Sequence, residues 1–266
     1  MCGIVAAVAD RNIVSVLLEG LRRLEYRGYD SAGLALINET GLQRLRAVGR
    51  VAELTAQAEE TQASGNTGIA HTRWATHGVP CERNAHPHIS GGLAVVHNGI
   101  IENHEALRNR LKDEGYVFTS ETDTEVVAHL IASELQKTAD FFTATRAAIA
   151  QLQGAYALAV LRESEPERVI VAREGSPLLL GLSDEGNYAA SDASALLQVT
   201  RRIVYLENGD CAELTRTGYR ITRVDGTPVT HPETESHLSA DAVELGQYRH
   251  YMQKEIFEQP VALSNT

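Results

Sequence analysis

Long apolar runs and paired cysteines are both missing from this 266-residue sequence, which also has no internal repeat and no low-complexity tract. No apolar stretch is long enough to cross a bilayer, and the opening MCGIVAAVADRN has no basic segment of the kind that starts a secretory signal. The three cysteines, Cys2, Cys81 and Cys211, form no CxxC pair, which favours reduced thiols over a disulfide framework or a structural zinc site. We therefore expect a cytoplasmic protein with no membrane partner.

Basic residues are also fewer than acidic residues. Lysine and arginine number 24 against 35 aspartates and glutamates, which gives a net charge of −11 and a pI near 5.4. Such a surface repels phosphate backbones, so no nucleic-acid partner is expected. Hydrophobic residues make up 43% of the chain, enough for a sizeable core in one large domain with a short extension.

Apolar periodicity predicts an α+β fold. A buried strand is expected over residues 2–9, and Val14, Leu17, Leu21 and Leu24 then recur at helical spacing after the possible caps Asp10 and Asn12. Further helices are expected over residues 51–62, 104–114, 124–136 and 143–153, and strands over 33–37, 42–48, 68–72, 93–97, 155–161, 168–173, 178–182, 187–190, 203–206 and 211–214. Helices grouped among many short strands indicate layered, mainly antiparallel sheets rather than alternating βαβ units.

The chain divides into three parts by composition. Residues 2–227 contain the expected core, residues 228–247 are polar and are typical of a linker, and residues 248–259 can begin a helix. We therefore expect one main domain, a linker, and the start of a further segment that reaches residue 266.

Cys2 follows the initiator methionine directly. Its small side chain permits removal of Met1, which would leave one residue carrying both a thiol and a free α-amine. An α-amine has a pKa of about 7.7–8.0 and can act as a general base near neutral pH. The alternative is a cysteine buried at the start of a core strand.

The segment HTRWATHG, residues 71–78, leaves a predicted strand and enters a polar loop. Arg73 at that position can bind a small carboxylate in a bidentate manner, which a lysine cannot do. Trp74 is the only tryptophan and can close over a ligand. The alternatives are a surface ion pair for Arg73 and core packing for Trp74.

Two further segments place polar groups next to predicted elements. The Asn98 side-chain amide and the Gly99 backbone N–H can converge on one oxygen as an oxyanion hole, although Asn-Gly more commonly marks a hairpin turn. Asp123, in SETDTE, can hold an ammonium group or can simply cap the following helix.

Histidines gather in one third of the chain. Only Asn84-Ala85-His86-Pro87-His88 brings two of them close together, in a proline-containing loop without a neighbouring carboxylate, which is unlike a zinc site. No metal is therefore expected, and structural roles are the default interpretation for this set: His71, His77, His86, His88, His97 and His104.

Together these segments resemble a known family. The similarity involves MCGIV, LRRLEYRGYDSAG (21–33), HTRWATHG (71–78), NAHPH (84–88), HNGIIEN (97–103), SETDTEV (120–126), AREGSPL (172–178), Ser191-Asp192 and YRHYMQKEIFEQ (248–259). They resemble the glutaminase domain of the glutamine–fructose-6-phosphate aminotransferases, or glucosamine-6-phosphate synthases. These enzymes are class II glutamine amidotransferases of the N-terminal nucleophile hydrolase superfamily.

That resemblance implies roles for the residues discussed above. Cys2 would be the nucleophile, and Asn98 and Gly99 would form the oxyanion hole. Arg73 would bind the α-carboxylate of L-glutamine and Asp123 its α-amino group. Trp74, Thr76 and His77 would belong to a loop that closes over glutamine. Arg27, His86 and His97 would form a supporting set around the nucleophile.

The resemblance also implies a four-layer αββα sandwich, no cofactor, and ammonia release through a γ-glutamyl thioester. Residues 2–227 would be the glutaminase domain and 248–266 the beginning of a sugar-isomerase half. Fructose 6-phosphate would be a substrate only of the complete enzyme, which is expected to be a homodimer in the hexosamine pathway, whereas this chain would give glutamate and ammonia alone. Two other hypotheses stay open: a different N-terminal nucleophile amidohydrolase, and a non-catalytic regulatory domain.

Overall fold

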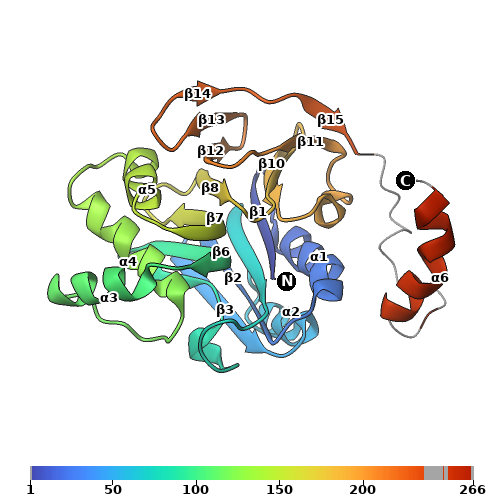
Figure 1. Ribbon diagram of the computed structural model, residues 1–266, viewed down its shortest axis with the longest axis horizontal. Helices are drawn as coiled ribbons and strands as arrows, with labels where there is room; N and C mark the ends of the chain where they lie inside the picture. Colours follow the sequence, from blue (N-terminus) through green and yellow to red (C-terminus); the bar gives the residue numbers. More distant parts are fainter. Residues whose placement is uncertain (1, 237–247, 249–250, 265–266) are drawn as a thin grey trace.

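The computed structural model describes residues 2–236, 248 and 251–264. Two antiparallel sheets stack face to face and helices cover both outer faces, which gives four layers (Figure 1). The expected α+β sandwich is therefore confirmed. No helix in the described ranges is long and apolar enough to span a membrane.

The first sheet has eight strands in the order β15-β11-β9-β10-β1-β4-β2-β3. At its centre β1 (Gly3–Ala9) pairs with β4 (Thr67–Arg73), and all seven residues of β1 are buried. Burial on both faces explains why β1 is a continuous apolar run rather than an alternating one. The other strands are β2 (Ser31–Asn38), β3 (Gly41–Val48), β9 (Leu179–Leu182), β10 (Gly186–Ala190), β11 (Arg202–Tyr205) and β15 (Glu233–Glu235).

The second sheet has seven strands in the order β14-β13-β12-β8-β7-β6-β5. Its longest members, β6 (Leu93–Ile101) and β7 (Gly154–Arg162), pair along their whole length. The remaining strands are β5 (His88–Ser90), β8 (Arg168–Glu174), β12 (Asp210–Thr215), β13 (Tyr219–Arg223) and β14 (Pro228–Val229).

Three apolar clusters hold the layers together. Helices α1 (Val14–Leu24) and α2 (Val51–Glu60) pack on the outer face of the eight-stranded sheet. A second cluster fills the space between the sheets. Helices α3 (His104–Asp113), α4 (Asp123–Leu135) and α5 (Phe141–Ile149) cover the seven-stranded sheet (Figure 1). Short 3-10 turns occur at Glu25–Arg27, Glu82–Asn84 and Ala193–Leu196.

The structure excludes two of the alternatives that the sequence left open. Asn98 and Gly99 do not form a hairpin turn, because β6 continues through them and pairs them with Ala157 and Tyr156 of β7. Asp123 is not a helix cap either: Thr122 is the N-cap of α4 and accepts the Glu125 N–H at 3.3 Å, while Asp123 is the first helical residue.

The C-terminal part begins with paired strands rather than with a linker. β14 adds to the edge of the seven-stranded sheet, and β15 pairs with β11 at the edge of the other sheet. The packed structure therefore continues to Ser236, nine residues beyond the expected boundary at residue 227. Most of the expected linker, residues 237–247, lies outside the described residues. The helix expected after it is α6 (Tyr251–Ser264).

Candidate active site

Strand pairing brings Cys2 next to the polar loop that follows β4. Because β1 and β4 are antiparallel and Gly3 pairs with Thr72, the start of β1 lies beside the end of β4. The Trp74 N–H donates a hydrogen bond to Cys2 Sγ at 3.1 Å. The Cys2 thiol in turn donates to the Trp74 carbonyl oxygen at 3.5 Å. Glycine is needed at position 3, because a Cβ there would lie 2.7 Å from Thr72 Oγ1.

The surroundings of the Cys2 thiol favour its protonated form. Burial raises its pKa, and the hydrogen bond from Trp74 and the nearby Arg73 oppose this effect without cancelling it. A nucleophile in this state needs a base to take its proton. While Met1 is attached, the Cys2 nitrogen is an amide and cannot be that base.

The other two cysteines lie elsewhere. Cys81 follows the Trp74 loop and lines neither cavity at Cys2. Cys211 is fully buried on β12, and burial raises the pKa of its thiol to about 12. A thiol with such a pKa supplies almost no thiolate at neutral pH, so Cys2 is the sulfur best placed for chemistry.

An open cavity of about 330 Å³ lies directly over Cys2. Five separate segments line it: the residue before β1, the turn after α1, the β4 loop, the end of β6 and the turn after β8. The lining residues are Cys2, Arg27, Trp74, Thr76, Asn98, Gly99, Ile100, Ser176 and Pro177. The structure therefore brings the expected nucleophile and the expected oxyanion donors to one cavity.

The Asn98 side chain is held in one orientation. Its Oδ1 lies 3.0 Å from His71 Nε2, and its Nδ2 donates to the Cys2 carbonyl at 3.2 Å. Burial lowers the pKa of His71 to about 3, so the imidazole is neutral and donates through Nε2. One amide N–H of Asn98 is thus committed to Cys2, and the second remains for an oxyanion in the cavity.

Gly99 supplies a backbone shape that other residues cannot adopt. Its φ is +124°, and a Cβ at this position would lie 2.0 Å from the Ala155 carbonyl oxygen. This glycine lets β6 bend at the cavity wall while it keeps its pairing with β7.

A second, narrow pocket of about 10 Å³ is lined by both Arg73 and Asp123. Arg73 is 3% exposed, and its Nη2 donates to the carbonyls of His77 and, at 3.0 Å, Gly78. Its Nη1 has no hydrogen-bond partner and lies 3.5 Å from Asp30 Oδ1. Arg73 is therefore a buried residue rather than a surface ion pair, and its Nη1 keeps a hydrogen-bond donor that no protein group uses.

Asp123 lies across the same pocket and is 4% exposed. Its Oδ2 accepts the Ile101 N–H at 2.9 Å and lies 3.8 Å from His97 Nδ1. Burial lowers the pKa of His97 despite the nearby carboxylate, so this histidine is uncharged. Within the described ranges Asp123 has no lysine or arginine partner, and a buried carboxylate in that situation suits a ligand ammonium group.

The buried histidines form a neutral cluster behind the pocket. The rings of His71 and His86 stack with centroids 4.2 Å apart, and the His97 N–H donates to His86 Nδ1 at 3.4 Å. Burial lowers the pKa of His86 and lowers that of His88 to about 3. Among the described residues no three His, Cys, Asp or Glu side chains are grouped to hold a metal ion.

The remaining predicted residues surround the mouth of the site. Trp74 is 54% exposed, and its ring lies over Gly28, where a Cβ would be 1.7 Å away. Thr76 is exposed, and His77 lies edge-to-face with His104 at 5.0 Å. Arg27 lines the Cys2 cavity and pairs with Asp192 at 2.5 Å.

Asp30 was given no role on the basis of sequence, yet it joins the two halves of the site. Its carboxylate accepts the Ala75 N–H and lies 3.5 Å from Arg73, and its own N–H donates to the Arg73 carbonyl at 2.7 Å. Ser176 and Pro177, also overlooked, form part of the Cys2 cavity wall. The family-like motifs LEYRGYDSAG and AREGSPL contain these residues, and membership in those motifs was the sequence signal that could have identified them.

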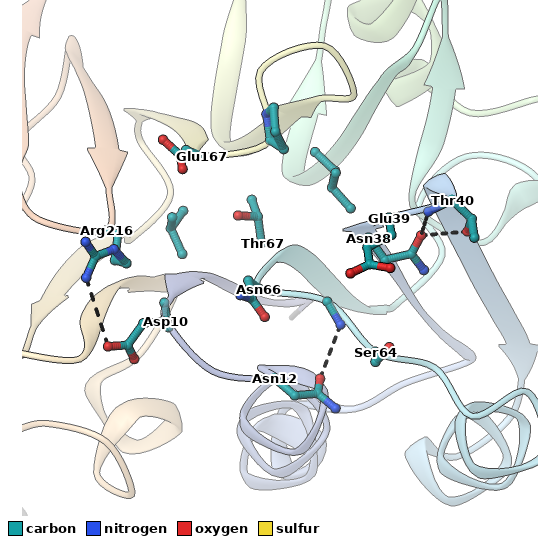
Figure 2. A pocket seen from close by; sticks show the side chains of 15 residues that line it. Asp10, Asn12, Asn38, Glu39, Thr40, Ser64, Asn66, Thr67, Glu167 and Arg216 are labelled. Carbon is teal, nitrogen blue, oxygen red and sulfur yellow. Dashed lines mark hydrogen bonds and ion pairs between the residues drawn. The ribbon is translucent and has the colours of Figure 1, made fainter.

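Two larger hollows lie away from this chemistry. One, of about 740 Å³, is at the other end of β1, where Asp10 and Arg216 face each other at 4.0 Å (Figure 2). The other, of about 950 Å³, is a groove along α1 and α2. Neither contains a cysteine or a histidine, so cavity size does not locate the candidate active site.

Comparisons with known proteins agree with this geometry. Residues 71–198 match the family model described as a glutamine amidotransferase domain. The chain is 57% identical over 267 residues to glutamine–fructose-6-phosphate aminotransferase (isomerizing) from Vibrio cholerae serotype O1, and 56% identical over 268 residues to the protein of that name from Pseudomonas syringae pv. tomato. Each alignment covers 100% of this chain but 44% of the relative, so the chain spans less than half the length of these proteins.

Solved structures show the same fold. Glutamine phosphoribosylpyrophosphate amidotransferase from B. subtilis, complexed with ADP and GMP, matches with a TM-score of 0.72 and 25% identity over 84% of this chain and 49% of that one. A glutamine aminotransferase class-II domain protein from Silicibacter pomeroyi matches with a TM-score of 0.58 and 18% identity, over 84% of this chain and 99% of that one.

Proposed function

We propose that this chain hydrolyses L-glutamine to glutamate and ammonia. It belongs to the class II glutamine amidotransferases, as the glutaminase domain found in glutamine–fructose-6-phosphate aminotransferases. The observation that carries this proposal is the arrangement around one site. The Cys2 thiol and an oriented Asn98 amide share an open cavity, and buried Arg73 and Asp123 face a pocket beside it. A nucleophile, an oxyanion donor and two groups of opposite charge are what an amino-acid amidase requires.

The chemistry begins once Met1 has been removed. The freed α-amine of Cys2 takes the thiol proton, and the thiolate attacks the side-chain amide carbon of glutamine. The second Asn98 N–H and the Gly99 N–H stabilise the oxyanion of the tetrahedral intermediate. The protonated amine then gives its proton to the departing nitrogen, and ammonia leaves a γ-glutamyl thioester on Cys2. Water hydrolyses this thioester to glutamate and restores the thiol.

The charged ends of glutamine would be held in the narrow pocket lined by Arg73 and Asp123. Arg73 Nη1 would bind the α-carboxylate and Asp123 the α-ammonium group. With a volume of about 10 Å³ the pocket accommodates at most one water molecule. The loop of Trp74, Thr76 and His77 must therefore open to admit glutamine and close again over it. Arg27 would complete the wall of the Cys2 cavity, and His86 and His97 the wall of the narrow pocket.

Sugar chemistry is proposed only for a longer protein. The relatives are named for fructose 6-phosphate, and this chain matches 44% of their length. In a protein that includes the rest, ammonia from Cys2 would aminate fructose 6-phosphate to glucosamine 6-phosphate. We propose that the 266-residue chain alone makes no amino sugar, needs no cofactor, and is not stimulated by fructose 6-phosphate, since a ligand shifts only a state to which it binds differentially.

One assay tests the proposal. The purified chain, with loss of Met1 verified by mass spectrometry, is incubated with glutamine, and glutamate and ammonia are measured together. Equal amounts of both products are expected, with none from Cys2→Ala. Turnover by Cys2→Ala, or no turnover by a folded chain with a free Cys2 amine, would contradict the proposed function. Amino-sugar formation, or faster turnover with fructose 6-phosphate, would contradict only the claim about the chain alone.

A further inference from the structure

Asn84 is fully buried, and hydrogen bonds engage both ends of its side-chain amide. Its Nδ2 donates to the Val79 carbonyl and to Glu121 Oε2, each at 3.0 Å, and its Oδ1 accepts the Glu121 N–H at 3.0 Å. These bonds join the loop that follows β4 to the residues that precede α4. An amide is well suited to this position, because it donates to two oxygens and accepts from an N–H at once.

The loop side of this contact leads directly to Arg73. Gly78 has a φ of +78°, and a Cβ there would lie 2.6 Å from Asn84 Nδ2 and 3.1 Å from Glu121 Cβ. The Gly78 carbonyl accepts a hydrogen bond from Arg73 Nη2 at 3.0 Å. The position of the Arg73 guanidinium therefore depends on a loop residue that packs against Asn84.

The other side leads to Asp123. Glu121 lies two residues before it, and between them Thr122 Oγ1 hydrogen-bonds to His88 Nε2 at 2.9 Å. Asn84 and His88 belong to the same segment, NAHPH, so this short segment fixes both residues that precede Asp123. The Arg73 and Asp123 side chains, which line the same narrow pocket, are thus connected through Asn84.

We propose that Asn84 is a positioning residue for the amino-acid substrate, which sets the separation between the arginine that binds the carboxylate and the aspartate that binds the ammonium group. It lines neither cavity at Cys2, so it acts through the loop and through Glu121. This inference rests on the proposed function and adds a residue to it. Errors of about 1 Å in the placement of binding groups are costly, because both ends of a small ligand must be engaged together.

The structure offers a matched control. Arg83, next to Asn84, pairs with the same Glu121 carboxylate at 2.8 Å, but the two side chains are 59% and 50% exposed. Exposed pairs of this kind contribute little free energy. Arg83→Ala therefore removes the positively charged partner of the Glu121 carboxylate and leaves the hydrogen bonds of the buried Asn84 amide in place.

The experiment compares Asn84→Asp, the double variant Asn84→Asp/Glu121→Gln, and Arg83→Ala with the parent chain. Asn84→Asp keeps the acceptor for the Glu121 N–H but places carboxylate oxygens against Glu121 Oε2 and the Val79 carbonyl. We expect its KM for glutamine to rise about tenfold to a hundredfold, as for a lost charge-assisted bond, with kcat within about threefold of the parent. In the double variant a glutamine amide at position 121 can donate to the carboxylate introduced at position 84, so part of the loss in KM should be restored. Arg83→Ala should stay within about twofold of the parent.

A second measurement separates positioning from folding. Each variant is also made in the Cys2→Ala background, where glutamine binding is followed by calorimetry and unfolding by Tm. The inference would be overturned if Asn84→Asp lowers Tm but leaves KM and Kd unchanged. It would also be overturned if the double variant restores none of the loss in KM, or if Arg83→Ala has effects equal to those of Asn84→Asp. If the parent binds glutamine without hydrolysing it, only the proposed function fails, and the role of Asn84 is decided from Kd. If the parent neither binds nor hydrolyses glutamine, both fail.

Discussion

The backbone N–H of Trp74 donates a hydrogen bond to the sulfur of Cys2 at 3.1 Å, although 72 positions separate the two residues in the chain. A thiolate accepts such a bond more strongly than a thiol does, because a charged acceptor strengthens it. The loop that would close over the substrate therefore also stabilises the reactive form of the nucleophile. We therefore expect loop closure and nucleophile activation to be coupled through this one contact.

Cys2 should be the only cysteine that reacts with a glutamine-like electrophile. Cys2→Ala and a protein that retains Met1 should both be inactive, because the first lacks the thiol and the second lacks the basic amine. Cys81→Ala and Cys211→Ala should keep activity within about twofold of the parent, since neither residue lines the site and surface or distant changes act weakly. Mass spectrometry of labelled peptides locates the reaction, and a label on Cys81 would show that the nucleophile is assigned wrongly.

Arg73→Lys should weaken glutamine binding more than turnover. The guanidinium divides its donors between the loop carbonyls and the ligand, and an ammonium group cannot reproduce that fork. Loss of a charge-assisted pair costs about 1.5–3 kcal/mol, so KM should rise about tenfold to a hundredfold. Asp123→Asn should raise KM in the same range. Steady-state kinetics test both variants, and parent-like KM values in the two would remove the proposed binding roles.

Asn98→Ala should slow the chemical step. The Asn98 Nδ2 already donates to Cys2, and because Asn98 lines the Cys2 cavity we propose that its remaining N–H stabilises the oxyanion of the intermediate. Removal of one oxyanion donor lowers kcat by about a hundred- to a thousandfold in a well-studied protease. We expect a lower kcat with little change in KM, measured over a full range of glutamine concentrations. A change confined to KM would make Asn98 a substrate-binding residue instead.

Acid should destabilise the fold from about pH 6.5 downward, where free histidine begins to take up protons. Burial lowers the pKa of His71 and His88 to about 3, so the unfolded chain binds protons over this range while the folded chain does not. The free energy of unfolding is therefore largest above about pH 6.5 and decreases as the pH falls toward about 3. Urea unfolding at about pH 7.5 and about pH 5.5, on either side of the free-histidine pKa, measures the slope. His88→Gln should make it shallower, and an unchanged slope would show that His88 does not contribute.

The interior of the fold could be predicted from the sequence because its signals are local. The apolar run of β1 indicates a strand buried on both faces, and the spacing of Leu17, Leu21 and Leu24 indicates the buried face of α1. The edge strands β14 and β15 were not predicted. Glu233–Glu235 is exposed and polar, and only its backbone pairing with β11 makes it a strand. Ile203 and Thr234 pair although 31 positions separate them in the chain. A local sequence pattern does not reveal a partner at that distance.

The candidate site shows the same division. Cys2, Arg73, Asn98 and Asp123 could be picked out because their chemistry and their motifs are visible in the sequence, and the structure brings them together. The hairpin turn, which the sequence left open as the alternative at Asn98 and Gly99, does not form, because pairing with β7 outweighs the local preference of Asn-Gly. Asp30 was overlooked because its partners, Arg73 and Ala75, become neighbours only when β2 pairs with β4.

The indole of Trp74, lying half-exposed over Gly28, has a spectroscopic consequence. As the chain contains one tryptophan, all of its tryptophan emission originates from the loop beside Cys2. Emission wavelength and intensity follow the exposure of an indole to water, so the protein carries a built-in optical reporter at the mouth of its own candidate site. Opening and closing of that loop can therefore be timed by stopped-flow fluorescence in the unlabelled chain, without a substitution that would disturb the hydrogen bond from Trp74 to the nucleophile.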